Sequence, residues 1–82
     1  MKGTLSVSVR AKDGIWYEGA AEWVRAVSPE GSFEVWPGHA PLLAGLTQGM
    51  LTLQTPSGLK ERPVTQGFLR VENDQLLILL TA

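Results

Sequence analysis

His39 is the only histidine of the 82-residue chain, and it lies between Pro37 and Pro41. An imidazole can act as a general base or as a metal ligand near neutral pH. Both roles need further groups, yet no second histidine, no cysteine and no carboxylate at ligand spacing accompanies it. The chain also lacks a plausible Ser/His/Asp set or carboxylate pair. We therefore expect no catalytic residue and no metal site. We interpret His39 as a side chain that hydrogen-bonds nearby backbone and holds its loop, with direct partner contact as the alternative.

The segment around His39 has the composition of a stiff, shaped loop. Residues 32–36 alternate small or polar side chains with apolar ones, as a short strand does. Pro37 and Gly38 suit the two central positions of a type II turn, because proline presets φ and glycine accepts a positive φ. With Pro41 three residues after Gly38, residues 37–41 can form neither a helix nor a ladder strand. The apolar run 42–46 that follows is expected to be buried.

The remaining chain shows short alternating segments separated by turn signals. Gly19 is expected to break one strand from the next, and Pro63 favours an edge position because proline lacks an N–H. Asn73-Asp74 is typical of a tight hairpin turn. No amphipathic pattern of helical length is present, so the sequence predicts an all-β sandwich or barrel. The predicted strands cover residues 5–11, 15–18, 20–27, 32–36, 50–55, 60–65, 68–71 and 75–81.

Composition limits the partners. Seven basic and eight acidic residues give a net charge of −1, and no basic stripe points to nucleic acid. The absence of cysteine excludes disulfides and thiolate metal sites. The longest apolar run, residues 76–80, is far short of the ~20 residues that a membrane span needs. We expect one domain over residues 1–82, no cofactor and no direct insertion into a membrane.

Tryptophan and leucine supply the candidate contact residues. If Leu76, Ile78 and Leu80 face the core, Leu77 and Leu79 point away from it. Either that strand is covered on both faces, or the two leucines form an exposed patch that meets a partner or a twin molecule. Of three tryptophans, one is expected in the core. The better candidates for partner contact are Trp23 and Trp36, since tryptophan is enriched at interface hot spots.

The order of residues resembles a known family. The run Glu-Gly-x-Phe-x-Val-x-Pro-Gly-His-Ala-Pro-Leu-Leu over residues 30–43 resembles the signature of the ε subunit of F-type ATP synthases, the δ subunit of mitochondria. The resemblance implies a two-sheet antiparallel β-sandwich of about eight to ten short strands. It further implies a non-catalytic central-stalk subunit of the rotor, which couples the γ subunit to the membrane c-ring at the cytoplasmic face of an energy-transducing membrane. Similarity extends to residues 17–19, 48–51, 67–71 and 76–80.

The resemblance also assigns roles to residues. Pro37 and Gly38 would shape the loop that faces the polar loops of the c-ring, and the residues expected to meet the ring are Ser32, His39, Ala40, Pro41 and Leu42. The residues expected to meet γ are Trp23, Trp36, Leu77 and Leu79, and a homodimer of the isolated domain is a further possibility for the leucine patch. Glu34, Trp36 and Gln66 depart from the family pattern and leave the detailed loop contacts open.

The expectations also concern the helical hairpin of the family and two rival functions. The family's C-terminal helical hairpin has no counterpart in the 82 residues, so we expect neither inhibition through those helices nor ATP binding by them. The main rival is a free-standing β-sandwich binding module outside the ATP synthase. A small hydrolase is a weaker rival, because no catalytic set is present.

Overall fold

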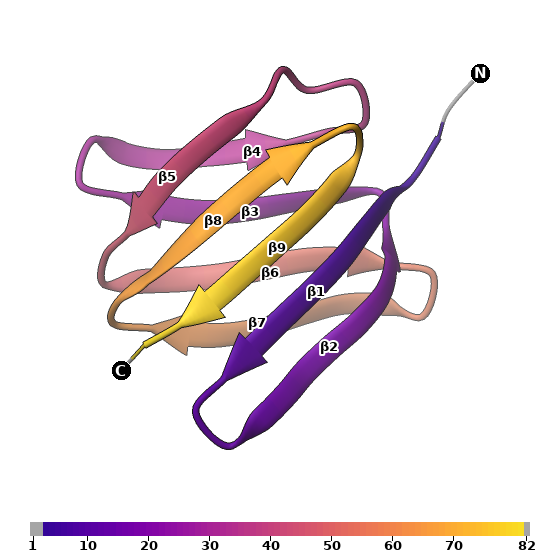
Figure 1. The fold of residues 1–82 in the computed structure, drawn as a ribbon. Helices are drawn as coiled ribbons and strands as arrows, with labels where there is room; N and C mark the ends of the chain where they lie inside the picture. Colours follow the sequence, from indigo (N-terminus) through magenta and orange to yellow (C-terminus); the bar gives the residue numbers. More distant parts are fainter. Residues whose placement is uncertain (1–2, 82) are drawn as a thin grey trace.

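A computed structural model describes residues 3–81 as nine strands in two sheets (Figure 1). One sheet has five strands in the order β2-β1-β9-β8-β5, and the other has four in the order β4-β3-β6-β7. The predicted two-sheet β-sandwich is therefore confirmed. The strands are β1 (Leu5–Ala11), β2 (Gly14–Ala21), β3 (Trp23–Ser28), β4 (Gly31–Val35), β5 (Leu42–Leu46), β6 (Gly49–Thr55), β7 (Gly58–Val64), β8 (Gly67–Glu72) and β9 (Gln75–Leu80).

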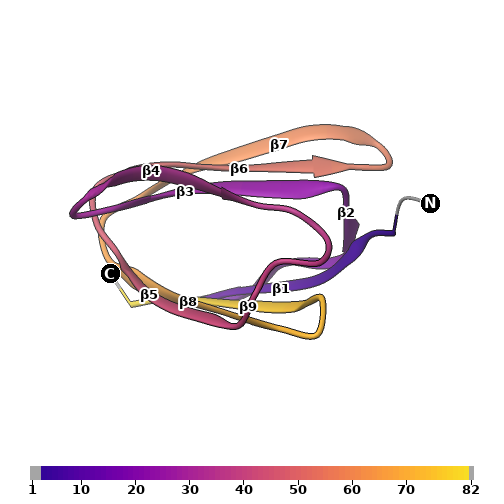
Figure 2. The ribbon, with the colours of Figure 1, turned by 90° about the horizontal axis from the view of Figure 1, so that it is seen from above.

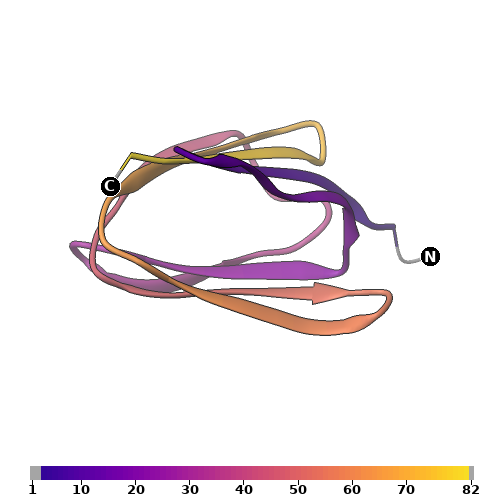
Figure 3. The ribbon, with the colours of Figure 1, turned by 90° about the horizontal axis from the view of Figure 1, so that it is seen from below.

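The core lies between the two sheets, which Figures 2 and 3 show as separate layers. Side chains alternate across a strand, so every second residue of β1, β8 and β9 is buried between the sheets. The largest fully buried side chains come from both sheets, which joins the layers through one apolar cluster. They are Leu5, Leu51, Leu53, Leu69, Leu76, Ile78, Val7, Val9, Val24, Val35 and Val71.

The sheets contain one pairing that the antiparallel expectation missed. β1 and β9 run parallel, with Val7 beside Leu76 and Val9 beside Ile78, whereas every other pair is antiparallel. A parallel pair needs a long crossover, and here nearly the whole chain lies between the two strands. The first and last strands therefore lie side by side in the middle of the five-stranded sheet.

The predicted strand break at Gly19 is wrong. β2 continues through Gly19, and the chain changes sheets at Glu22, whose N–H donates to the carbonyl of Gln54 at 2.7 Å. Gly19 serves a close approach instead, because a Cβ there would lie 3.1 Å from the Tyr17 hydroxyl oxygen. That hydroxyl donates to the carbonyl of Ala20 at 2.6 Å. The strand predicted over residues 20–27 accordingly divides between the end of β2 and β3.

Two local predictions are confirmed and one needs correction. Pro63 lies in β7, an edge strand. Asn73 and Asp74 have φ of 52° and 60°, as a type I′ hairpin requires. Burial of the whole 42–46 run is wrong, because this segment is the edge strand β5 and its alternate residues face outward. The side chain of Leu43 is 72% exposed.

Candidate functional site

The loop between β4 and β5 is built on the expected turn. The N–H of His39 donates to the carbonyl of Trp36 at 3.1 Å, and Gly38 has a φ of 87°. An i to i+3 hydrogen bond with positive φ only at the third residue defines a type II turn, so that prediction is confirmed. The N–H of Gly38 also donates to Oδ1 of Asp74 at 2.7 Å. This bond ties the loop to the β8–β9 hairpin, 36 positions away in the chain.

His39 makes the local contact that its isolation in the sequence suggested. Its Nδ1 lies 2.6 Å from the carbonyl oxygen of Ala40. A carbonyl can only accept, so Nδ1 carries the proton in this contact. The side chain is half-buried against its own loop. The arrangement stabilises a backbone that two prolines already restrict, and it leaves this end of the sandwich with a fixed shape.

Three of the five residues expected to face the ring line one groove. The groove has a volume of about 610 Å³ and lies between the edge strands β4 and β5. Ser32, His39 and Leu42 line it, whereas Ala40 and Pro41 lie in the exposed loop at its end. Glu30 and Glu34 are also among its lining residues, and no lysine or arginine is. The lining of the groove therefore combines two acidic side chains with apolar ones such as Phe33 and Leu42.

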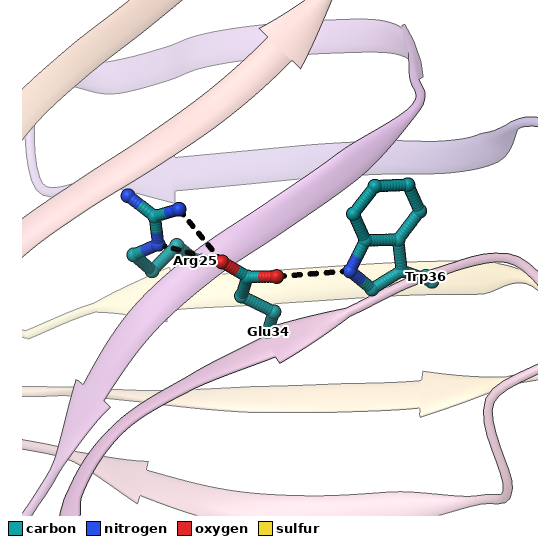
Figure 4. A network of polar contacts seen from close by, with 3 residues as sticks. All are labelled: Arg25, Glu34 and Trp36. Atoms are coloured by element: carbon teal, nitrogen blue, oxygen red, sulfur yellow. Dashed lines mark hydrogen bonds and ion pairs between the residues drawn. The ribbon is translucent and has the colours of Figure 1, made fainter.

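A polar network occupies the outer face of the four-stranded sheet (Figure 4). Oε2 of Glu34 accepts hydrogen bonds from Nε and Nη2 of Arg25 at 2.9 and 2.6 Å. Oε1 of Glu34 accepts one from the indole Nε1 of Trp36 at 3.0 Å. The bond from Trp36, followed by those from Arg25, holds the pKa of the Glu34 carboxyl below its ordinary value of 4.5. Glu34, noted in the sequence only as a departure from the family pattern, therefore organises this surface.

The two tryptophans expected to meet a partner contact each other beside this network. The ring centroids of Trp23 and Trp36 are 6.1 Å apart with an interplanar angle of 32°. The guanidinium carbon of Arg25 lies 5.0 Å from the Trp23 ring centroid, a cation–π contact. Trp16, by contrast, packs against the core, as expected for one of the three tryptophans.

The four residues expected to meet γ lie on opposite outer faces. Trp23 and Trp36 share the outer face of the four-stranded sheet with the register pair Arg25–Glu34. Leu77 and Leu79 alternate with the buried residues of β9, so they lie on the outer face of the five-stranded sheet. The sandwich separates these faces, as Figure 2 shows for the two sheets. One flat partner surface cannot reach both pairs.

We call the outer face of the five-stranded sheet, which carries Leu77 and Leu79, the leucine face. It holds more exposed apolar side chains than the sequence indicated. Phe68 stands directly opposite Leu79 and is 52% exposed, and Leu79 is 41% exposed. Leu43 lies beside Arg70, which in turn lies beside Leu77. Phe68 could have been found from the sequence, because Leu69 and Val71 occupy alternate positions of its strand and leave Phe68 on the other face. Leu43 could not, because an unbroken apolar run does not show which residues face outward.

Residues 3–81 hold no group of three or more histidine and acidic side chains placed to bind a metal. Over the same described range, no helix is long and apolar enough to cross a membrane. The features on the surface are faces, a groove and a stiff loop. These features define a β-sandwich with two outer faces and one stiff loop end.

Comparison with known proteins identifies the family. Residues 4–82 match the family described as ATP synthase, Delta/Epsilon chain, beta-sandwich domain, and the chain belongs to it. It is 39% identical over 79 residues to the ATP synthase epsilon chain of Halalkalibacterium halodurans, a match that covers 96% of this chain and 59% of that one. With the same coverage of both chains, it is 38% identical to the epsilon chain of Anoxybacillus flavithermus. The chain thus spans about three fifths of the length of these relatives.

Solved structures share the fold. A chain of the Euglena gracilis mitochondrial ATP synthase, in an OSCP/F1/c-ring structure, superposes with a TM-score of 0.88 at 17% identity. That match covers 98% of this chain and 52% of the other. A chain from the central stalk and c-ring structure of the Tetrahymena thermophila mitochondrial ATP synthase gives 0.80 at 17% identity, over 99% and 66% of the two chains.

Proposed function

We propose that this chain is a central-stalk subunit of the rotor in an F1Fo ATP synthase, where one domain over residues 1–82 couples γ to the c-ring. Membership of the Delta/Epsilon β-sandwich family supports this role most directly. The subunit makes and breaks no covalent bond, and the catalytic sites lie on other subunits. It works as a peripheral part of the complex, at the cytoplasmic face of the energy-transducing membrane.

The loop end of the sandwich is the surface proposed to meet the polar loops of the c-ring. Ser32, His39 and Leu42 share one groove there, and Ala40 and Pro41 stand at its end. The type II turn, the His39 contact and the Asp74 tether hold the loop in one conformation. A preformed loop loses little conformational entropy on docking, which favours tight transmission of torque between partners.

The leucine face is the surface proposed to meet γ. Leu77 and Leu79 lie on a central strand of the five-stranded sheet, and Phe68 extends their patch. Exposed apolar patches of this kind mark contact sites in soluble domains. Because Trp23 and Trp36 lie on the opposite face, they belong to a separate contact, and γ at the tryptophan face is the alternative assignment. A twin molecule is the second candidate partner for the leucine face.

The decisive experiment is capture of purified γ by the 82-residue chain. Leu77→Lys combined with Leu79→Lys is expected to leave a folded domain that binds γ at least about tenfold more weakly, since two charges enter an apolar contact. Ser57→Lys combined with Gln66→Lys adds the same charge in exposed turns and serves as the matched control. Trp23→Ser with Trp36→Ser tests the other face.

Each outcome assigns a partner or removes one. Loss of γ binding only in the tryptophan variant would move the γ contact to that face. An unfolded leucine variant would show that those side chains stabilise the fold. Failure of the unmodified chain to bind γ at micromolar concentration would favour the rival, a free-standing β-sandwich binding module. The same capture assay with purified c-ring and Pro41→Ala tests the loop end.

A further inference from the structure

The two sides of the sandwich, where the edge strands of the sheets lie, differ in how they are protected against pairing with another strand. On the side of β2 and β7, a bulge in the β1–β2 ladder inserts Trp16. The Lys60 ammonium lies 5.2 Å from the Trp16 ring centroid and 5.7 Å from that of Tyr17, and the Arg62 guanidinium lies 5.6 Å from Trp16. With Pro63 in the same edge strand, these cations blunt β7 against pairing with another strand.

On the opposite side of the sandwich, the edge strand β5 has neither charges nor a proline to prevent pairing. Of the four edge strands in the described range, β2, β4 and β7 each contain at least one charged residue, and β5 contains none. β5 is also free of proline, and among the described strands it is hydrogen-bonded only to β8. The groove of about 610 Å³ separates β5 from β4, and no described strand pairs with β5 on that side. An apolar, uncharged edge of this kind is a template for strand addition.

The sequence of β5 is complementary to itself. In an antiparallel pair related by a two-fold axis at Ala44, Leu43 of one copy stands opposite Gly45 of the other, and Leu42 stands opposite Leu46. No like charges meet in this register, because Leu-Leu-Ala-Gly-Leu carries none. The most exposed leucine of each copy therefore meets the one position of the partner strand that has no side chain.

The next strand completes the contact. Phe68 of β8 is the cross-strand neighbour of Gly45 and is 52% exposed on the same outer face as Leu43. The space over Gly45 is open, since a Cβ there would meet no atom within 4 Å, and a leucine that enters this space comes within reach of Phe68. Each copy thus offers both a projecting Leu43 and an apolar recess at Gly45 and Phe68. The two-fold axis makes each contact occur twice.

We propose that the free edge of β5 is a pairing site for a second copy of this chain, which joins two five-stranded sheets into one continuous sheet of ten strands. This assigns the self-association to the strand edge rather than to Leu77 and Leu79. The contact is small beside standard protein interfaces, so we expect a dissociation constant of roughly 10–100 µM. Since Leu42 also belongs to the loop end proposed for the c-ring, pairing and ring docking exclude each other.

Sedimentation equilibrium of the full chain, with amide hydrogen exchange on the same samples, tests the proposal. We expect the mass to rise toward that of a dimer with concentration and the exchange of β5 amides to slow selectively. Gly45→Lys is expected to weaken the association at least about tenfold. The new side chain fills the recess and brings one positive charge from each copy to the shared edge. The fold tolerates this change, since a Cβ at Gly45 meets no atom within 4 Å. Ser57→Lys, with the same added charge in the β6–β7 turn, should associate as the unmodified chain does.

A chain that stays monomeric at every concentration overturns the proposal. So does a dimer that survives Gly45→Lys, or one that Leu77→Lys disrupts while Gly45→Lys does not. Leu43→Ser, which keeps Gly45 and removes the projecting side chain, is a second variant expected to weaken the dimer. The capture of γ is measured separately with dilute, monomeric protein, so failure of the edge pairing and failure of the stalk assignment are distinguishable.

Discussion

The carboxylate of Asp74 accepts a hydrogen bond from the N–H of Gly38 at 2.7 Å, which joins the His39 loop to the turn of the β8–β9 hairpin. The carbonyl of the same Asp74 accepts from the N–H of Ser6 at 2.8 Å. One turn residue thus connects the loop, the hairpin and the first strand. The position of the proposed ring-facing loop therefore depends on a residue in the turn of the β8–β9 hairpin.

Asp74→Gly is expected to loosen this loop without straining the hairpin. Glycine adopts the φ of 60° found at this position but supplies no side-chain acceptor. Loss of one exposed hydrogen bond of about 1 kcal/mol should speed the amide exchange of Gly38 roughly fivefold. Asp74→Asn, which keeps an acceptor oxygen and tolerates the same φ, is the control and should exchange nearly as the unmodified chain does. Equal exchange in all three proteins would contradict the tether.

Gly38→Val is expected to destabilise the domain and weaken ring docking together. Gly38 has a φ of 87°, which a β-branched residue resists, so the cost should be about 1–3 kcal/mol. The midpoint of urea unfolding measures this cost. Gly3→Val is the matched control, because Gly3 has no positive φ and open space at its Cβ. Unchanged unfolding and docking of Gly38→Val would count against the turn as the element that shapes the loop.

Glu34 is expected to titrate below its ordinary pKa of 4.5. The hydrogen bond from Trp36 is the largest cause, and Arg25 adds both a hydrogen bond and its charge, so Trp36→Phe and Arg25→Gln should each raise the pKa of Glu34. Since the pKa is lowered in the folded state, the stabilisation is present above the unfolded value and is lost as pH falls through the folded value. Carboxyl carbon shifts followed by NMR through the acid range give the midpoint. A midpoint of 4.5 or above in the unmodified chain would show that these bonds do not form in solution.

Gly67→Ala is expected to push β8 and β9 apart. Gly67 begins β8 and pairs with Leu80 of β9. A Cβ there would lie 2.5 Å from the carbonyl oxygen of Leu79, a backbone atom of the neighbouring strand that cannot swing aside. Forced displacement of packed backbone costs about 1–3 kcal/mol. Thermal unfolding measures the loss, and Gly45→Ala, with free space at its Cβ, should remain close to the unmodified chain.

Local chemistry predicted much of this fold. Alternation identified the inward residues of β1 and β9, and Asn73-Asp74 and Pro37-Gly38 specified their turns, because each depends only on adjacent residues. Long-range features could not be predicted from the sequence. The parallel β1–β9 pair and the change of sheet at Glu22 depend on strands far apart in the chain, where sequence pattern carries no register.

The candidate site divides in the same way. The stiffness of the loop and the outward direction of Leu77 and Leu79 could be predicted from neighbouring residues. The tether from Asp74 to Gly38 could not, since the two residues are 36 positions apart. Periodicity places side chains on one face of a strand but does not say which sheet that strand joins. For this reason the sequence grouped tryptophans and leucines that the sandwich separates.

The location of β9 governs when this protein can fold during its synthesis. β9 lies between β1 and β8, so the strands of the five-stranded sheet on either side of it cannot join until residues 75–80 have left the ribosome. In a nascent chain that lacks them, β1 can pair only with β2 and β8 only with β5, and each of these two ribbons has an unpaired strand edge. Unpaired strand edges make such an intermediate prone to aggregation until β9 joins the two ribbons.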